Sequence, residues 1–196
     1  MRKIIAITQV SVDGVMQAPG GSEEDRRSGF NHGGWAMPFV DDALNIVETV
    51  GEYDMLLGRR TYVIFAAYWP YQDNPIAKAF NKATKYVVTR TLDHLDWEKS
   101  QRIDGDVVEE VRRLKASHGP ELHIWGSSEL LQTLIAADLV DEYRIAVFPV
   151  VLGEGKRLFE NGVPPRRLAL VDTRSTPSGV LVNTYHLAGP LPNESV

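Results

Sequence analysis

Glycine, arginine and hydroxyl side chains follow apolar runs at two places in the sequence. At the first, Gly58 is followed within three residues by Arg59 and Thr61, and at the second, Gly126 is followed by Ser127. In both places the apolar run is typical of a strand and a helical pattern begins at once. Free backbone N–H groups and the positive end of the helix dipole favour an anion there, and glycine allows close approach. Each turn therefore predicts a phosphate site.

A third turn offers side chains of the same kind. Val88-Thr89-Arg90 ends another apolar run with a hydroxyl and a guanidinium, groups that a 2′-phosphate attracts. Taken alone, a glycine at a strand end or a serine at a helix start is ordinary structural punctuation. Several together are more informative, because the phosphates of a dinucleotide extend far enough to touch neighbouring turns. The three turns together predict a dinucleotide site.

The elements that would position these turns alternate along the chain. Short β-branched runs alternate with helical patterns, which is typical of α/β proteins with a mostly parallel sheet covered by helices. The last three strands have no helical pattern between them, so the mixed sheet is expected to end antiparallel. Helical spacing of apolar residues predicts helices around 39–50, 107–114 and 130–135. The predicted strands are Lys3–Val10, Tyr53–Leu57, Lys85–Thr89, Glu121–Trp125, Glu142–Val151, Arg167–Ser175 and Val180–Leu187.

Length and composition limit the class of protein. With 196 residues, 43% of them hydrophobic, the chain fits one domain, which we place at 1–188, followed by a frayed tail at 189–196. The absence of cysteine excludes disulfides, thiolate metal sites and a cysteine nucleophile. The opening apolar run Ile4–Ile7 is too short for a signal segment or a membrane span. We therefore expect a cytoplasmic protein without a membrane partner.

Charge and motif patterns argue against several other functions. The net charge is -5 and the arginine pairs are scattered, so nucleic acid is not an expected partner. The five histidines have no paired or i,i+4 spacing, so no metal site is expected. Gly153-Glu154-Gly155 lacks the third glycine of a dinucleotide fingerprint and leads into no Walker sequence, and we interpret it as a turn. A G-x-S-x-G nucleophile turn is also absent.

The segment Ser11–Trp35 is the longest predicted connection. It is rich in glycine, serine and charged residues and separates the first strand from the first predicted helix. Connections of this length inside a domain are usually functional loops or disordered ones. The segment is therefore either part of the site or an insertion without a role.

Taken together, these residues resemble a known family. Ser11-Val12-Asp13-Gly14, Gly58-Arg59-Arg60-Thr61-Tyr62 and Trp125-Gly126-Ser127 are similar to turns of the dihydrofolate-reductase-like superfamily. The run from Gly126 to Phe159 is similar to the reductase domain of the bifunctional riboflavin deaminase-reductase. The resemblance extends from Arg2 to Leu187. It implies a three-layer αβα dihydrofolate-reductase-like fold and a homodimer.

The resemblance also implies that NADPH lies across the carboxyl edge of the sheet. The backbone of Val10 would meet the nicotinamide carboxamide, and Trp35 would line the cofactor site while the long loop acts as a lid. Its position after Gly33-Gly34 is equally consistent with Trp35 being an aromatic plug under the loop. The other implied cofactor residues belong to the three turns: Gly58, Arg59, Thr61, Thr89, Arg90, Gly126, Ser127, Ser128, Glu129 and Leu130.

The implied activity is that of an NADPH-dependent oxidoreductase that transfers a hydride to a small heterocyclic substrate, as in 5-amino-6-(5-phosphoribosylamino)uracil reductase. Riboflavin-pathway reductases carry an acidic residue before the glycine turn, where it holds the substrate ring. Here that position is Trp125, whose indole cannot replace the hydrogen bonds of a carboxylate. The departure places the riboflavin-pathway substrate in doubt. A dihydrofolate- or pterin-type reductase and a non-catalytic nucleotide-binding scaffold therefore remain alternatives.

Two carboxylic acids are candidate proton donors. In dihydrofolate reductases an acid on the first helix helps to protonate the pterin, and counting back from Gly58 reaches Asp42. A carboxyl group with a raised pKa would suit that role. Adjacent acids at a helix start, such as Asp41 and Asp42, also complement the helix dipole. Asp13, in the turn that follows the first strand, is the second candidate, and a bound water is the remaining alternative.

Overall fold

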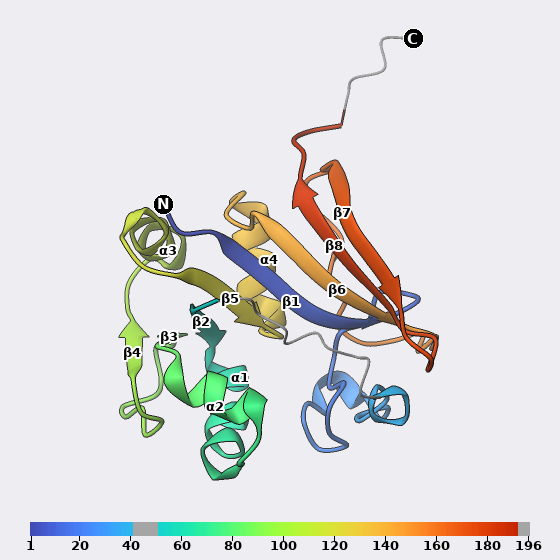
Figure 1. Cartoon of the computed structure of the whole chain (residues 1–196), viewed down its shortest axis with the longest axis horizontal. Coiled ribbons are helices and arrows are strands. Elements are labelled where there is room, and N and C mark those ends of the chain that lie inside the picture. The colour runs from blue at the N-terminus through green and yellow to red at the C-terminus, as the bar shows by residue number, and fades with distance from the viewer. Residues whose placement is uncertain (41–50, 192–196) are drawn as a thin grey trace.

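Eight strands form one mixed sheet in the computed structural model, which describes residues 1–40 and 51–191. The strands are β1 (Ile4–Ser11), β2 (Tyr53–Gly58), β3 (Lys85–Val88), β4 (Ser100–Ile103), β5 (Glu121–Trp125), β6 (Glu142–Phe148), β7 (Leu168–Ser175) and β8 (Leu181–Leu187). Their order across the sheet is β4-β3-β2-β5-β1-β6-β8-β7. All pairs from β4 to β6 are parallel, whereas β8 is antiparallel to both β6 and β7 (Figure 1). The predicted mixed sheet with an antiparallel end is confirmed.

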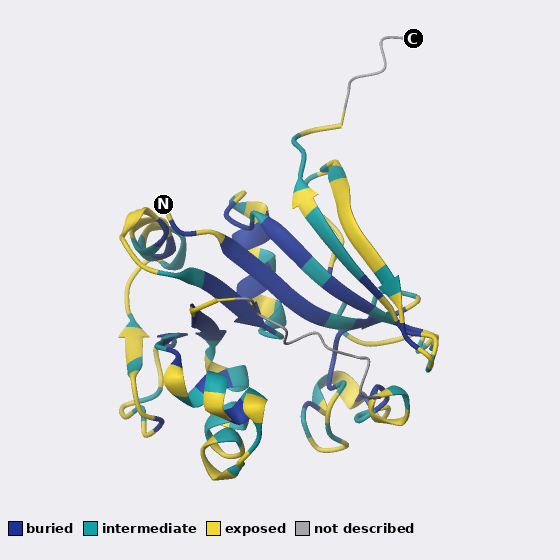
Figure 2. Ribbon diagram, in the orientation of Figure 1, coloured by how far each residue is buried: buried dark blue, intermediate teal, exposed yellow. Residues whose placement is uncertain are grey.

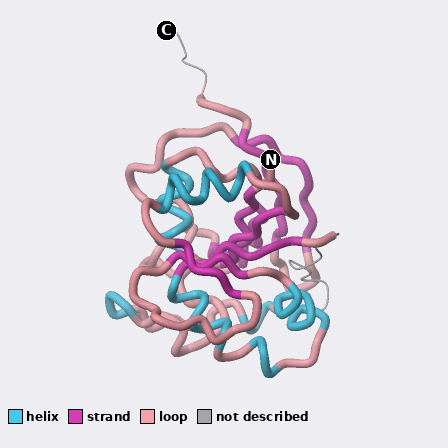
Figure 3. The backbone as a smooth tube through the Cα atoms, turned by 90° about the vertical axis from the view of Figure 1, so that its left-hand side faces the viewer, coloured by secondary structure: helices cyan, strands magenta, loops and turns pink. Residues whose placement is uncertain are grey.

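Helices cover both faces of the sheet (Figures 1 and 3). The helices are α1 (Arg59–Ala66), α2 (Pro75–Lys82), α3 (Val107–Ala116) and α4 (Ser128–Ala136). Side chains of α1 and α2, including Tyr62 and Phe80, pack with Ile5 of β1 in one core cluster. Side chains of α3 and α4 pack with Ile4 and other residues in a second cluster. Because neighbouring β1 residues point into different clusters, the sheet is the middle one of three layers, as predicted.

The central strands are buried on both faces (Figure 2). Nearly every residue of β1 and β2 is buried. Strands covered on both sides read as continuous apolar runs rather than as alternating ones, which is why these two were visible in the sequence. By contrast, β7 is mostly exposed. The parallel part of the sheet is therefore the rigid base from which the turns project.

The structure corrects several predicted elements. The strand expected to reach Val151 ends at Phe148, because Pro149 has no N–H to donate to the ladder. The edge strand β4 was not predicted, since its sequence SQRI is largely polar and its two central residues are exposed. Helix α2 was also missed. The helix predicted around 39–50 falls mainly on residues 41–50, outside the described residues, as does most of the predicted frayed tail.

In its described part, the long segment between β1 and β2 contains an isolated β-bridge from Val15 to Arg157 and two short 3-10 turns, η1 (Arg27–Gly29) and η2 (Met37–Phe39). A further 3-10 turn, η3 (Trp69–Tyr71), joins α1 to α2. Within the described ranges, no helix has the length and apolar character needed to cross a bilayer.

Candidate functional site

The two glycine turns lie side by side at the carboxyl ends of β2 and β5, which are parallel neighbours. The backbone N–H of Gly58 donates to Oγ of Ser127 at 3.0 Å. The backbone N–H of Ser127 donates to Oγ1 of Thr61 at 3.1 Å. Residues that are far apart in the sequence therefore form one hydrogen-bonded corner.

The helices that start at this corner are not capped by described side chains. Neither α1 nor α4 has a side-chain cap hydrogen bond, whereas Asn74 caps α2 and Asp106 caps α3. The hydroxyl of Ser127, the N-cap residue of α4, accepts from the N–H of Gly58 rather than capping its helix, and its hydrogen remains available to donate. Uncapped first-turn N–H groups and a positive dipole end suit an anion.

The backbone at the corner is strained. Gly126 has a φ of 52°, and Ser127 follows in the left-handed region with φ 51° and ψ 47°. A residue with a side chain in that region costs roughly 1 kcal/mol, and such strain concentrates at functional sites. The hydrogen bonds to Gly58 and Thr61 hold Ser127 in this conformation at the start of α4.

A cavity of about 700 Å³ opens beside the corner. It is walled by the three predicted turns, by part of the long loop, and by residues of α1, α2 and the start of α3. The predicted cofactor residues that line it are Gly58, Arg59, Thr61, Thr89, Arg90, Gly126, Ser127, Ser128, Glu129 and Leu130. The structure thus brings the residues of all three turns to one cavity.

The other predicted cofactor residues do not line this cavity. The side chain of Val10 is buried in the core, although its neighbours Thr8 and Gln9 face the cavity. The β1–β5 register ends at Ile7, so beyond that residue β1 has no strand partner on its β5 side. Trp35 donates from Nε1 to the backbone carbonyl of Gln17 at 2.8 Å and meets Phe148 edge-on, contacts that match an aromatic plug.

Of the two candidate proton donors, the structure describes only Asp13, which is not among the residues that line the cavity. Asp42 lies outside the described residues. Asp13 accepts hydrogen bonds from Oγ of Ser11 at 2.6 Å and from the backbone N–H groups of Leu152 and Gly153. The Ser11 hydrogen bond is the main cause that lowers the pKa of Asp13 to about 2. Because Asp13 is then ionised at neutral pH, the structure does not favour it as a proton donor.

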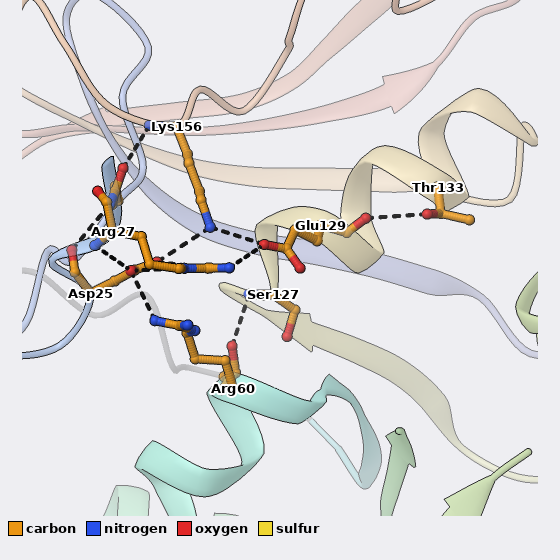
Figure 4. Close-up of polar contacts among 9 residues, drawn as sticks. Asp25, Arg27, Arg60, Ser127, Glu129, Thr133 and Lys156 are labelled. Carbon is orange, nitrogen blue, oxygen red and sulfur yellow. Dashed lines mark hydrogen bonds and ion pairs between the residues drawn. The ribbon is translucent and has the colours of Figure 1, made fainter. Parts of the chain in front are cut away.

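A charged network that the sequence did not reveal joins the long loop to the corner (Figure 4). The nearly buried carboxylate of Asp25 pairs with Arg27, with Arg60 at 2.9 Å and with Lys156 at 3.3 Å. Glu129, in the first turn of α4, pairs with Arg27 and Lys156. Burial raises the pKa of Asp25, but hydrogen bonds from Arg27 and the charge of Lys156 outweigh it and hold the pKa well below its usual range.

Two arginines that line the cavity do not belong to this ion-pair network. Arg59 and Arg90 line the cavity, and neither forms an ion pair with another described residue. Three cations of the network share two carboxylates, so they are largely neutralised. Arg59 and Arg90 are therefore the cavity cations best placed to meet an anionic ligand.

One part of the cavity wall is apolar and aromatic. We call it the aromatic end, and it consists of Phe65, Trp69, Ile76, Phe80 and Trp125. Phe80 stacks on Phe65 and meets Trp69 and Trp125 edge-on, with ring centroids 4.9 to 5.6 Å apart. The Nε1 atom of Trp125 is buried and has no hydrogen-bond partner among the described residues.

The sequence analysis did not predict this aromatic cluster, because the helix α2, which carries Ile76 and Phe80, was not recognised. Its start nevertheless carries a readable signal, because Asn74 is a favoured N-cap and Pro75 a favoured first helical residue. The Asn74 side chain does accept from the backbone N–H of Ala77 at 2.9 Å. The ion pairs of Asp25 had no such signal, since they join segments that are distant in the sequence.

The fold is that of a three-layer α/β protein with one large cavity at the carboxyl ends of its parallel strands, and comparison with known proteins gives a reductase-type family. Residues 2–182 match the RibD C-terminal domain family, to which the chain therefore belongs. YyaP, an uncharacterized protein of Bacillus subtilis (strain 168), is 32% identical over 197 residues, covering 96% of both proteins.

Solved structures support the same fold. A provisionally named riboflavin biosynthesis protein from Shewanella sp. PV-4 superposes with a TM-score of 0.67 at 21% identity, covering 95% of this chain and 99% of the other. Dihydrofolate reductase from Enterococcus faecalis, complexed with NADP(H) and RAB-propyl, gives a TM-score of 0.58 at 18% identity, with 95% and 96% covered. The dihydrofolate-reductase-like fold inferred from the sequence is confirmed.

Proposed function

We propose that this protein is an NADPH-dependent reductase that transfers a hydride to a small heterocyclic substrate, in the manner of 5-amino-6-(5-phosphoribosylamino)uracil reductases. One observation carries the proposal. Two helices with uncapped N-termini, α1 and α4, begin at a shared corner and open onto the same cavity. Membership of the RibD C-terminal domain family and the dihydrofolate-reductase-like fold support it.

The described residues fit a nicotinamide dinucleotide. The first-turn N–H groups of α1 and α4 and the hydroxyl of Ser127 would hold the diphosphate, with Arg59 supplying charge. Thr89 and Arg90, at the end of β3, would hold the 2′-phosphate, which favours NADPH over NADH. The unpaired β5 side of β1 beyond Ile7 offers backbone groups to the nicotinamide carboxamide close to Val10, the residue to which the resemblance gives that role.

When bound, NADPH would supply the hydride, and the chain would supply orientation, exclusion of water and a proton. The aromatic end would hold the flat face of a substrate ring. The long loop, fixed over the cavity by Asp25, would keep water away. These roles require the long loop to remain bound to the glycine corner through the ion pairs of Asp25.

The proton has two proposed sources. Asp42 keeps the role that the resemblance gives it. Glu24 lines the cavity, and burial raises its pKa against the opposing hydrogen bonds from the N–H groups of Gly20 and Gly21. Replacing each with the amide, as Asp42→Asn and Glu24→Gln, should lower kcat and flatten its pH profile only for the residue that delivers the proton.

The proposal includes a cytoplasmic location and a homodimer. The absence of cysteine is compatible with a reducing compartment. Exposed apolar residues on β7 and β8 are suited to contact a second copy of the chain.

Titration of the purified protein with NADPH and with NADH, followed by calorimetry, tests the proposed function. NADPH should bind more tightly than NADH, and Arg90→Ala should reduce that preference. Arg59→Ala should weaken both cofactors, whereas Arg112→Ala on the exposed face of α3 should change neither. Absence of binding by both cofactors would refute the reductase. Tight NADPH binding without oxidation by any pterin or aminopyrimidine would instead favour a nucleotide-binding scaffold.

A further inference from the structure

An exposed turn between β6 and β7 presents an asparagine followed directly by a glycine. Asn161 and Gly162 occupy this turn, and both residues are exposed to solvent. The backbone N–H of Val163 donates to the carbonyl of Glu160 at 3.3 Å and closes the turn around the pair. None of these four described residues lines the cavity. Any chemistry of the pair is therefore separate from the proposed cofactor site.

An asparagine before a glycine has an intrinsic reactivity, and asparagine is one of the thermally labile residue types. The backbone nitrogen of the glycine attacks Cγ of the asparagine, so that an N–Cγ bond forms and the side-chain nitrogen leaves as ammonia. The proton of the attacking N–H leaves with the ammonia, and a cyclic imide remains. Water then opens the imide at one of its two carbonyl carbons, which yields aspartate or isoaspartate. The reaction consumes only water.

The surroundings of Gly162 leave its nitrogen free to make this attack. Its N–H donates no hydrogen bond to the backbone of any described residue. The carboxamide of Asn161 likewise has no hydrogen-bond partner in the described part of the chain. A Cβ added at Gly162 would meet no atom within 4 Å, so the space around it is open. Its φ of 92° is strained only for residues with a side chain, and glycine leaves this conformation readily.

Two other asparagines are blocked by their local structure. Asn74 precedes Pro75, whose ring nitrogen has no proton to lose. Asn81 lies in α2, where its Nδ2 donates to the carbonyl of Trp69 at 3.2 Å and its Oδ1 accepts from Nε1 of Trp97 at 2.7 Å. A carboxamide held at both of its polar atoms cannot swing its Cγ toward the next backbone nitrogen.

The remaining described asparagines lack the glycine. Asn183 lies in β8 and accepts from Oγ1 of Thr173 at 2.6 Å, so both its backbone and its side chain are held. Asn31 is exposed, as Asn161 is, but the residue after it is His32, whose side chain hinders the attack. No other asparagine in the sequence precedes a glycine. Asn31 therefore provides a matched comparison, alike in residue type and exposure and different in its neighbour.

We propose that Asn161 is a site of spontaneous deamidation in the folded protein. Conversion to aspartate or isoaspartate would add a negative charge to a chain whose net charge is -5. In isoaspartate the main chain runs through the former side chain, which lengthens the turn and disturbs the hydrogen bond between Val163 and Glu160. The cavity is not altered, because the turn forms no part of its wall. The proposal therefore holds or fails independently of the reductase activity.

Timed incubation of the purified protein tests this proposal. Samples held at mildly acidic and at mildly alkaline pH would be digested under acidic conditions and analysed by mass spectrometry, with isoaspartate detected by an isoaspartyl methyltransferase. Asn161 should deamidate at least about tenfold faster than Asn31. The rate should rise with pH, because the attacking nitrogen must lose its proton. Equal rates at the two positions, or earlier conversion of Asn81 or Asn183, would overturn the proposal.

Substitutions at the two exposed asparagines identify the source of the product. Asn161→Gln should abolish the early acidic species on an ion-exchange column, because a glutamine side chain would have to close a larger ring. Asn31→Gln should leave that species unchanged. Both positions are exposed, so neither substitution should change the urea unfolding of the protein. An acidic species that forms equally fast in Asn161→Gln would place the modification elsewhere and refute the assignment.

The same measurement on the chain unfolded in guanidinium chloride isolates the effect of the fold. If the folded turn leaves the pair unprotected, unfolding should accelerate the conversion of Asn161 by less than about tenfold. A larger acceleration would show that the fold protects Asn161 and would overturn the proposal.

Discussion

The hydroxyl of Ser127 accepts a hydrogen bond from the backbone N–H of Gly58 at 3.0 Å, although the two residues are 69 positions apart in the sequence. This contact joins the ends of β2 and β5 and fixes the starts of α1 and α4 relative to each other. Ser127 holds the contact from a left-handed backbone conformation. The geometry of the proposed diphosphate site therefore depends on this side chain together with that of Thr61, which accepts from the N–H of Ser127.

Ser127→Ala should weaken both the fold and cofactor binding. The substitution leaves the N–H of Gly58 without its partner and retains the left-handed strain, at a cost of roughly 1–3 kcal/mol in unfolding free energy. Ser127→Gly should cost less, because glycine accepts the left-handed conformation. Urea unfolding and NADPH titration measure both effects. Ser128→Ala is the control, and equal losses at positions 127 and 128 would contradict the assigned role.

Asp25→Asn should loosen the long loop. It removes the carboxylate shared by Arg27, Arg60 and Lys156 and leaves Glu129 alone to balance them. For a pair that is mostly buried, we expect a loss of about 1–3 kcal/mol in unfolding free energy and faster hydrogen exchange in residues 12–40. Asp104→Asn, which breaks an exposed pair with Arg102, should cost less than about 1 kcal/mol. Equal losses of stability in the two variants would show that Asp25 does not hold the long loop in place.

Much of the fold could be predicted because burial on both faces produces long apolar runs. The parallel strands β1, β2 and β5 were visible for that reason, and so was the absence of helices before β7 and β8. The edge strand β4 could not be found in this way, since Gln101 and Arg102 face solvent. Strand pairing at a sheet edge depends on its neighbour rather than on its own composition.

The site was predictable only in part, for a related reason. Glycine turns after parallel strands must meet at one sheet edge, so Gly58 and Gly126 could be placed together from local sequence. The contacts of Asp25 with Arg60 and Lys156 depend on the path of an irregular loop, which no periodic pattern records. Trp125 was singled out as a departure from the family, but its packing on Phe80 required the unrecognised helix α2.

The proposed homodimer should depend on β7. Leu170 and Val171 are 55% and 54% exposed on this strand at the edge of the sheet, where unpaired backbone groups also invite a partner. Light scattering after size exclusion should give the mass of a dimer, and Leu170→Lys should shift it toward the monomer. Val63→Lys is the control for an added surface charge. A monomer at every concentration of the unmodified protein would refute the dimer.

Acid should destabilise the fold through His123. Its ring is buried and stacks on Tyr53 with centroids 4.4 Å apart, and burial, followed by the charge of Arg144, lowers its pKa from 6.5 to about 3. The unfolded chain therefore binds a proton that the folded chain excludes between those values. The contribution of the neutral ring to stability is complete above pH 6.5 and is lost as the pH falls toward 3, at up to about 1.4 kcal/mol per pH unit.

His123→Phe isolates this effect, because it keeps an aromatic ring against Tyr53 and removes the titration. Urea unfolding from about pH 7.5 to about pH 5 should show the variant gaining stability over the parent protein as the pH falls. NMR titration of the parent protein should show a His123 ring that stays neutral throughout that range. A stability difference that does not change with pH, or a ring that becomes protonated in the folded state, would show that burial does not hold His123 neutral.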